Sequence, residues 1–327
     1  MDWSPNTSLE VRKLRAEMYH DIRSFFMQHN VLEVETPALS NAGNTDPFIE
    51  SIKVPFKLNS NAELTNRYLH TSPEYPMKRL LAAGSGDIYQ ICKVWRKGEI
   101  GDNHNPEFTL LEWYRVGFNY HELMQEVSSL LHKLLHKLIP TFSEEPIIYT
   151  YKQLFLEKFT IDPHIASKEI LANCVKDNIN GLETDNLDKQ ALLDALLTHC
   201  IEPNFEKNRL TFICDYPASQ SALAQVRTES DYAVAERFEV YLGSVELGNG
   251  YQEEVDYQRN TQILQSENAM RKKHNLKQVT EDALFIKACK KGIPRSAGVA
   301  IGLDRVLMCI SNEKSIQKVI NFPWDKA

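Results

Sequence analysis

The chain has 327 residues, of which 43% are hydrophobic and 25% are charged, and its formal net charge is −7. These values are typical of a soluble globular protein with one large or two modest domains. No apolar run approaches the length of a membrane span, and the negative charge argues against a broad nucleic-acid-binding surface.

The cysteines and the N-terminal segment both indicate a reduced, cytoplasmic compartment. The six cysteines are scattered, with no C-x-x-C pair, which argues against a zinc site and against a disulfide scaffold. The first residues lack the basic and apolar regions of a secretory signal.

The first predicted element is a helix from Ser8 to about His29, because Ser8 can cap it and apolar residues follow at helical spacing. Residues 30–40 then predict a short strand that Pro37 ends. Proline cannot donate a hydrogen bond within a sheet, so we expect this strand at an edge or an interface. A further short strand is predicted near residues 48–54.

The next stretch contains the clearest hairpin pattern of the chain. Residues 67–76 predict a strand entering a turn, and residues 77–83 predict a short helix. Residues 87–115 then predict an alternating strand, a polar loop at 97–106 and a second extended run.

The middle of the chain is mainly helical. Residues 121–138 predict a helix whose leucines form one apolar face and belong to the core. Residues 141–209 are more polar and predict an insertion packed on the main sheet, with weaker helices at 151–159, 167–178 and 188–200.

The last third of the chain is rich in strands, with a hairpin turning at residues 243–244. Charged helices are predicted at 252–275 and 281–291, and a glycine-containing strand then enters a helix that begins near Leu303. Because strands mostly follow turns and helices are grouped between them, the pattern favours an α+β fold with an antiparallel sheet.

Arg96 stands at the entrance of the polar loop of the first hairpin, and Glu99, His104, Asn105, Glu107 and Glu112 lie in it or just past it. An arginine beside carboxylates and a histidine can bind a triphosphate and an amine together. The alternative is a solvated hairpin with ordinary surface charges.

The C-terminal strand is a second candidate site. Gly298 and Gly302 let a ligand lie flat against the backbone, and Arg305 in the first turn of the next helix can reach that ligand. The alternative is close packing of strand and helix, with Arg305 in a surface ion pair.

Carboxylates supply the remaining candidates. Glu239 and Glu246 lie on opposite arms of one hairpin, which can form a magnesium site beside phosphate or can be two exposed strand residues. Glu74 can bind an ammonium group or can complement a helix dipole. In that second interpretation its neighbours Lys78 and Arg79 are solvated.

Three stretches, in this order, resemble the signature motifs of class II aminoacyl-tRNA synthetases: VLEVETPAL, VWRKGEIGDNHNPEFTLLEWY and GVAIGLDR. Three more, TSPEY, AERFEVY and VELGNGY, are similar to the lysyl branch of that class. The resemblance covers roughly residues 10–120 and 210–325. It implies a single class II synthetase-like catalytic domain over residues 1–327, with an antiparallel sheet flanked by helices and an insertion at about 141–209.

The first of these motifs begins about thirty residues from the N-terminus, which leaves no room for the N-terminal OB-fold that reads the anticodon in lysyl-tRNA synthetases. The chain thus resembles the stand-alone paralogue family, the elongation factor P–(R)-β-lysine ligases, which the stretches SPEY, HNPEFTLLEWYR, YPASQSALAQ and VAERFEVY closely match. That resemblance implies a cytoplasmic homodimer. It also implies a ligase that uses ATP and Mg²⁺ to activate (R)-β-lysine as an adenylate, and that transfers it to a lysine side chain of elongation factor P.

The resemblance also implies roles for individual residues. Arg96 and Arg305 are expected to be catalytic. ATP is expected to contact Arg96, Gly98, Glu99, His104, Asn105, Phe108, Glu246, Leu247, Gly302 and Arg305. The amino-acid substrate is expected to contact Ser72, Pro73, Glu74, Tyr114, Asn249, Glu253 and Ala300. Mg²⁺ is expected to be held by Glu239 and Glu246.

Two positions depart from the patterns of related enzymes. Gly98 stands where the second motif usually has a glutamate, and either Glu99 or the Gly98 backbone can replace that contact to adenine. Ala300 stands where synthetases for α-lysine usually have glycine. We hypothesise that its methyl group helps to exclude α-lysine, since a pocket methyl shifts selectivity by about 1–3 kcal/mol.

Two other interpretations stay open. One is a truncated lysyl-tRNA synthetase-like enzyme that activates α-lysine, and the other is a catalytically inactive synthetase-like binding protein. Inactive proteins of this class usually lose an arginine of the second or third motif, whereas Arg96 and Arg305 are both present.

Overall fold

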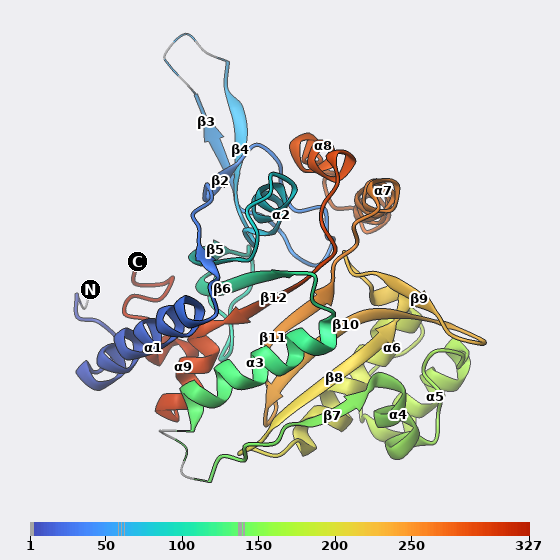
Figure 1. The fold of residues 1–327 in the computed structure, drawn as a ribbon. Helices are drawn as coiled ribbons and strands as arrows, with labels where there is room; N and C mark the ends of the chain where they lie inside the picture. Colours follow the sequence, from blue (N-terminus) through green and yellow to red (C-terminus); the bar gives the residue numbers. More distant parts are fainter. Residues whose placement is uncertain (1–2, 58, 60, 62, 137–138, 140) are drawn as a thin grey trace. The chain divides into compact units, whose positions relative to one another are not determined.

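The computed structural model describes residues 3–57, 59, 61, 63–136, 139 and 141–327. The chain divides into a first unit, Met1–Phe118 with Glu254–Ala327, and a second unit, Asn119–Glu253. Figure 1 labels the elements of both units. Each unit combines helices with mainly antiparallel strands, so the predicted α+β class is confirmed.

The first unit is built from both ends of the chain. Its helices are α1 (Leu9–Gln28), α2 (Glu74–Ala82), α7 (Tyr257–Lys273), α8 (Ala283–Lys291) and α9 (Leu303–Ser311). Its strands are β1 (Leu32–Glu33), β2 (Leu39–Ser40), β3 (Lys53–Phe56), β4 (Thr65–Leu69), β5 (Ile88–Trp95), β6 (Glu107–Val116) and β12 (Ser296–Gly302).

The larger sheet of the first unit has the strand order β1-β5-β6-β12, and a smaller sheet has the order β2-β4-β3. β5 and β6 pair antiparallel along their whole length, so the predicted hairpin is confirmed. β1 lies at the end of its sheet, as predicted, and Leu32 is 57% exposed there.

Helix α1 covers one face of this sheet. Ser8 caps it by accepting a hydrogen bond from the first turn, as predicted. The ring of Phe26 stacks on Tyr89 at 4.3 Å and meets Trp113 edge-on at 5.3 Å. Because successive side chains of a strand point to opposite faces, Glu112 lies on the face that α1 does not cover.

The start of α9 is anchored by Asp304, which is 1% exposed. Its Oδ2 accepts a hydrogen bond from the backbone N–H of Thr109 in β6 at 2.6 Å, and its Oδ1 pairs with Arg15 of α1 at 2.5 Å. A buried carboxylate needs such partners. They fix the first turn of α9 and therefore the position of the next residue, Arg305.

The second unit is continuous in sequence. Its helices are α3 (Tyr120–Leu135), α4 (Tyr151–Phe159), α5 (Lys168–Asn178) and α6 (Lys189–Leu196), and a π-helical turn, Leu197–Ile201, continues α6. Its strands are β7 (Ile147–Thr150), β8 (Leu210–Pro217), β9 (Val226–Thr228), β10 (Ala233–Leu242) and β11 (Val245–Gln252).

The strands of the second unit have the order β11-β10-β8-β7, and β9 pairs with β10. The hairpin of β10 and β11 turns at Gly243, whose φ of 56° lies in the left-handed region that glycine tolerates best. This confirms the second predicted hairpin.

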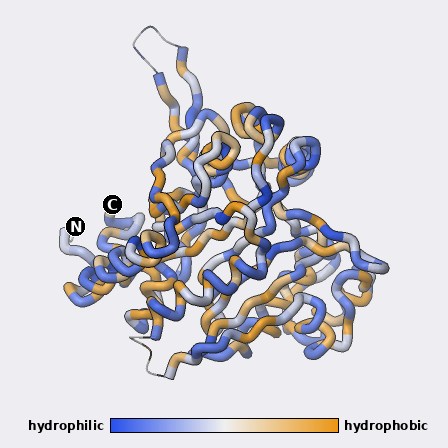
Figure 2. Tube along the Cα trace, viewed as in Figure 1, coloured by the Kyte–Doolittle hydropathy of each residue, from blue (hydrophilic) through white to orange (hydrophobic). Residues whose placement is uncertain are grey.

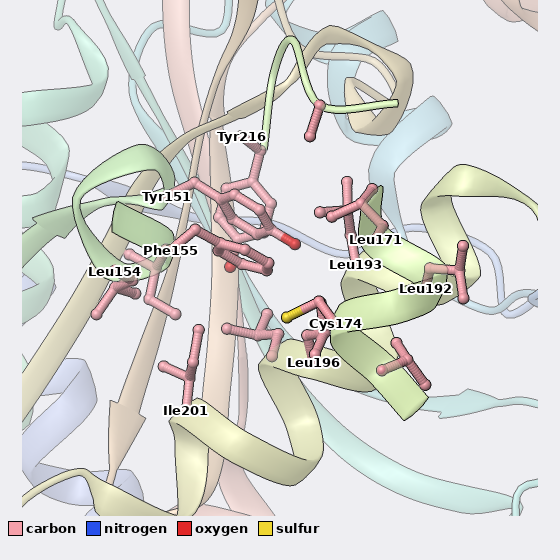
Figure 3. Close-up of a cluster of buried hydrophobic side chains, with 14 of the residues drawn as sticks. Tyr151, Leu154, Phe155, Leu171, Cys174, Leu192, Leu193, Leu196, Ile201 and Tyr216 are labelled. Atoms are coloured by element: carbon pink, nitrogen blue, oxygen red, sulfur yellow. The ribbon is translucent and has the colours of Figure 1, made fainter. Parts of the chain in front are cut away.

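Helices α4, α5 and α6 enclose a hydrophobic cluster against the strands of their own unit (Figure 3). Tyr151 and Phe155 of α4 stack at 4.8 Å, and Tyr216 of β8 lies 4.8 Å from Tyr151. The three helices predicted for the insertion are therefore present, and the last of them changes from α to π geometry after Leu196.

Several predicted boundaries are wrong. The strand expected near residues 48–54 is β3, at Lys53–Phe56, and α2 begins at Glu74 instead of residue 77. Helix α7 begins at Tyr257 instead of residue 252, because Asp256 caps it. The predicted helix end at residues 137–138 lies outside the described residues.

Most strand pairs in the described part of the chain are antiparallel, as expected, and two pairs are parallel. β1 pairs parallel with β5, and β7 pairs parallel with β8. In both pairs a helix lies between the two strands in the sequence, and such a crossover permits parallel pairing.

The helices and strands differ in hydropathy. In Figure 2, hydrophobic colour runs along the strands of the second unit, whereas α7 is hydrophilic over most of its length. Within the described part of the chain, every helix is too short or too polar to cross a membrane.

Candidate active site

The face of the first sheet that α1 leaves uncovered carries many of the residues expected to bind substrates. Alternate residues of β6 lie on it, namely Phe108, Leu110, Glu112 and Tyr114. Small residues of β12 stand beside them, since Gly302 pairs with Leu110, Ala300 with Glu112 and Gly298 with Tyr114. Small side chains leave the backbone accessible, so a flat ligand can lie against β12.

Arg96 stands at the end of β5 beside this face. Its guanidinium lies 5.1 Å from the ring centroid of Phe108, and its Nε donates to the carbonyl of Thr71 at 3.4 Å. Its Nη1 lies 3.8 Å from Oε1 of Glu99. The side chain is 26% exposed, so it is held in position and is still able to meet a phosphate.

The loop after Arg96 explains the departure at Gly98. Gly98 has a φ of 83°, in the left-handed region, where a glutamate would be strained. Glu99 instead points its carboxylate toward Arg96. We therefore expect Gly98 to meet adenine through its backbone only.

Arg305 and His104 approach each other from α9 and from the hairpin loop. Arg305 Nη2 and His104 Nε2 lie 2.8 Å apart, and Arg305 Nε donates to the carbonyl of Asn103 at 3.3 Å. Burial and the positive charge of Arg305 lower the pKa of His104. The imidazole is therefore neutral near pH 7 and can accept a hydrogen bond from Arg305.

Asn105 is 6% exposed, and both ends of its amide are used within the protein. Its Nδ2 donates to the carbonyl of Glu107 at 2.6 Å, and its Oδ1 accepts from the backbone N–H of Trp324 at 3.1 Å. Asn105 therefore holds the loop that carries His104, and its direct contact with a nucleotide stays a prediction.

A cavity of about 360 Å³ opens beside the start of α2. Ser72 and Glu74 line it, together with Arg79 and the residues that lead into α8, among them Glu281 and Asp282. Carboxylates outnumber arginine in this lining, which favours a cationic ligand. Pro73 is the N-cap residue of α2 and places Glu74 in the first turn.

Glu112 connects this cavity to the sheet face. Ser72 Oγ donates to Oε2 of Glu112 at 2.7 Å, and Tyr114 Oη donates to Oε1 at 2.7 Å. Burial and, next, the charge of Glu74 raise the pKa of Glu112 to about 8, although both hydroxyl donors and Lys78 act to lower it. Our sequence analysis counted Glu112 among the carboxylates of the hairpin but not among the expected substrate contacts. Its place two residues before Tyr114, on the same face of a strand, is the signal that identifies it.

Glu112 also makes the stability of the fold depend on pH. The folded pKa of about 8 lies above the ordinary glutamate value of about 4.3, so unfolding releases a proton between these pH values. The stabilisation is present at low pH and is lost as the pH rises toward 8. The free energy of unfolding of the wild type should fall between about pH 5 and about pH 8.5, whereas that of Glu112→Gln should not. The difference between the two proteins should therefore shift by a few kcal/mol in favour of Glu112→Gln over this range. Urea unfolding at both pH values measures this, and parallel stability curves for the two proteins would contradict it.

Lys78 is the clearest error among the sequence interpretations, because the alternative interpretation of Glu74 placed Lys78 in solvent. Its side chain is 0% exposed, and its Nζ donates to Oε1 of Glu74 at 2.6 Å, one turn away in α2. A buried ammonium group needs such a partner. Glu74 is therefore paired with a buried cation of the protein.

The second unit contributes the carboxylates of its hairpin. Glu239 pairs with Asn249 across β10 and β11, and Tyr241 pairs with Glu246, so all four lie on one face. Leu247 is 1% exposed and Glu253 is also 1% exposed, at the end of the unit.

Glu239 already has three donors. Arg237 meets its Oε1 at 2.5 Å, while Tyr216 and Tyr241 donate to its Oε2 at 2.6 and 2.5 Å. Burial raises the pKa of Glu239, against the lowering effect of Arg237. The sequence analysis did not identify Arg237, although it stands two residues before Glu239 on the same strand.

The residues fit a magnesium ion that arrives with a nucleotide. Mg²⁺ is usually bound by one or two carboxylates together with substrate phosphates. No group of three or more His, Cys, Asp or Glu side chains suited to a metal occurs among the described residues, which is compatible with that pattern. Glu246 can supply one carboxylate, whereas Glu239 is available only if Arg237 moves away.

The predicted site residues thus fall into two sets. The first unit contains Ser72, Pro73, Glu74, Arg96, Gly98, Glu99, His104, Asn105, Phe108, Tyr114, Ala300, Gly302 and Arg305. The second unit holds Glu239, Glu246, Leu247, Asn249 and Glu253.

Comparison with known proteins identifies the class to which this fold and these residues belong. The family model of the class II tRNA synthetases (D, K and N) matches residues 1–326, and the chain therefore belongs to that family. Curated relatives named elongation factor P–(R)-beta-lysine ligase are 40% identical in Histophilus somni (strain 2336), over 99% of this chain and 98% of the relative. In Hamiltonella defensa the identity is 40%, over 100% and 98%, and in Buchnera aphidicola subsp. Schizaphis graminum it is 38%, over 99% and 99%.

Within that class, the chain belongs to the elongation factor P–(R)-β-lysine ligase family, and it is an enzyme of the ligase type. Both the family resemblance and the class of enzyme predicted from the sequence are confirmed.

Proposed function

We propose that the enzyme activates (R)-β-lysine with ATP as a β-lysyl-adenylate and transfers the β-lysyl group to a lysine side chain of elongation factor P. The observation that carries the proposal is the uncovered face of the first sheet, where Arg96 stands at the end of the face that holds Glu112 and Tyr114. An arginine can bind a phosphate, and the buried groups on the same face can receive an ammonium, which supports the proposal. The acceptor follows from the names of the relatives, and a translation factor as acceptor favours a cytoplasmic reaction.

The reaction needs no nucleophile from the protein. The carboxylate of the amino acid attacks the α-phosphorus of ATP in line, and pyrophosphate leaves. Arg96 and Arg305 neutralise the charge that develops on the phosphates. An amine of the acceptor protein then attacks the carbonyl carbon of the mixed anhydride, and AMP leaves. When bound, Mg²⁺ supplies further neutralisation of the phosphate charge.

The substrate is proposed to lie with its carboxylate toward Arg96 and its amines toward the carboxylates. In the first unit, Ser72, Glu74 and Tyr114 are the proposed contacts, and the contacts expected from Asn249 and Glu253 of the second unit stay predictions. Isotope exchange between pyrophosphate and ATP, dependent on (R)-β-lysine, tests the first half-reaction. Exchange that depends on α-lysine alone would contradict the proposed substrate. The homodimer stays a prediction.

Ala300 is proposed to set the choice between isomers. It pairs with Glu112 across β6 and β12, so its methyl group stands beside the carboxylate that is proposed to serve the substrate amine. We expect Ala300→Gly to shift the ratio of kcat/KM for β-lysine over α-lysine toward α-lysine by about 5- to 100-fold. An unchanged ratio would show that the methyl group plays no part in selectivity.

A further inference from the structure

We propose that Lys78 is a positioning residue of the amino-acid pocket: it fixes Glu74 and balances the two carboxylates that receive the substrate ammonium. The proposal rests on the proposed function, since it concerns the same pocket. It begins from the hydrogen bonds that connect α2 to β6.

These contacts form a chain from the cavity into the core. Lys78 Nζ donates to Glu74 at 2.6 Å, and the backbone N–H of Glu74 donates to Ser72 Oγ at 3.0 Å. Ser72 Oγ donates in turn to Glu112 at 2.7 Å, and Tyr114 completes the chain on the other oxygen of Glu112. A displacement of Glu74 is therefore transmitted to Glu112 through Ser72.

Burial separates the roles of these groups. Glu74 is 24% exposed and lines the cavity, whereas Lys78 is 0% exposed and Glu112 is 3% exposed. A fully buried ammonium group cannot touch a ligand, so Lys78 acts only through its neighbours. Its cost of burial is balanced by the ion pair with Glu74.

The charges of Glu74, Glu112 and Lys78, taken together, suit one ammonium group. Glu74 and Glu112 carry two negative charges when ionised, and Lys78 carries one positive charge. Because the pKa of Glu112 is about 8, Glu112 holds a proton near pH 7 in the empty pocket, and the ammonium group of the substrate favours its ionisation. The single negative charge that then remains matches one substrate amine. Without Lys78, the charge of Glu74 opposes the ionisation of Glu112 more strongly.

The titratable groups that face Glu112 come from three elements. Glu74 and Lys78 come from α2, Cys92 comes from the adjacent strand β5, and Tyr114 comes from β6 itself. Burial is the largest cause that raises the pKa of Glu112, Glu74 is the next, and Lys78 opposes both. Loss of Lys78 should therefore move the ionisation of Glu112 to higher pH.

The test compares Lys78→Met with the wild type in pyrophosphate exchange, with (R)-β-lysine and ATP varied separately. Methionine fills the same space without the charge. We expect the KM for β-lysine to rise by about tenfold or more and the KM for ATP to change less than about twofold. The KM for β-lysine should also depend on pH, and the pH at which it falls should be higher in the variant than in the wild type. Lys78→Arg keeps the charge and should recover part of the loss.

Lys93→Met is the matched control, because Lys93 is an ion-paired lysine of the same unit that is 43% exposed. It should behave as the wild type. An unchanged KM for β-lysine in Lys78→Met would overturn the inference, as would an equal loss in both KM values that Lys78→Arg does not relieve. A wild type without exchange would instead refute the proposed function, and the inference would fall with it.

If Lys78→Met does not fold, two other variants are compared. One is Glu74→Gln alone, and the other combines Glu74→Gln with Lys78→Met. Removing both partners of a buried ion pair is better tolerated than removing one. The affinity for (R)-β-lysine, measured by calorimetry, should then change with pH. The midpoint of that change should lie at a higher pH in the double variant than in the single variant. Equal midpoints would overturn the inference.

Discussion

Replacing Arg96 with alanine is expected to reduce β-lysine-dependent exchange of pyrophosphate into ATP by about 10²- to 10³-fold. Arg96 presents a fork of donors at the end of β5, and the aromatic ring of Phe108 and the carboxylate of Glu99 hold it in place. The charge that develops on the α-phosphate in the transition state loses this fixed cation in the variant. The loss should appear mainly in kcat, because ground-state ATP has other proposed contacts.

Arg67→Ala is the matched control for this prediction. Arg67 belongs to β4 of the same unit and lies 5.7 Å from the ring centroid of Phe56, away from the sheet face that carries Phe108. Its variant should exchange at the wild-type rate. Exchange in Arg96→Ala within about twofold of the wild type would refute the role assigned to Arg96.

Replacing Glu246 with glutamine is expected to lower the exchange rate by about 10²-fold at low magnesium concentration and to increase the magnesium concentration needed for half-maximal rate. Glu246 is a proposed carboxylate ligand, because it lies on the same face of the hairpin as Glu239, whose oxygens meet Arg237, Tyr216 and Tyr241. An amide is a poorer ligand for a hard cation than a carboxylate. High magnesium concentration should restore part of the rate.

Glu236→Gln controls for the removal of a carboxylate from the same hairpin. Glu236 stands on β10 and pairs with Arg227 at 3.6 Å. It should leave the magnesium dependence unchanged. If Glu246→Gln and Glu236→Gln show the same dependence as the wild type, Glu246 does not serve the metal.

Periodicity predicted most of the elements. The helix capped by Ser8 and the hairpin of β5 and β6 follow from apolar spacing and from a loop of turn-forming residues, and both are present. The predicted start of α7 is wrong because residues 252–256 are mostly polar, like the helix that follows. In the structure Gln252 still belongs to β11, and Asp256 caps α7.

The environment of a charge was harder to predict. Sequence alone showed Lys78 as one of two cations on a short helix, and its burial depends on the packing of α2 against α8. The same holds for Arg237, which sequence reasoning passed over beside Glu239. Local pattern predicts which residues share a face, whereas burial and ion pairing arise from contacts between distant segments.

The site residues themselves came from motifs and not from geometry. In the first unit the structure brings Arg96, Glu112 and Tyr114 to one sheet face, and Glu112 was missing from the set predicted from the sequence. The positive φ of Gly98 gives a physical reason for the one departure in the second motif, because only glycine adopts that backbone without strain.

The mass of elongation factor P after incubation with this enzyme and ATP tests the central claim most directly. With (R)-β-lysine we expect an increase by one lysyl residue on a single side chain, a smaller yield with α-lysine, and no increase with Arg96→Ala. An unchanged mass with both isomers, under conditions in which the same enzyme charges tRNA with α-lysine, would contradict the proposed function.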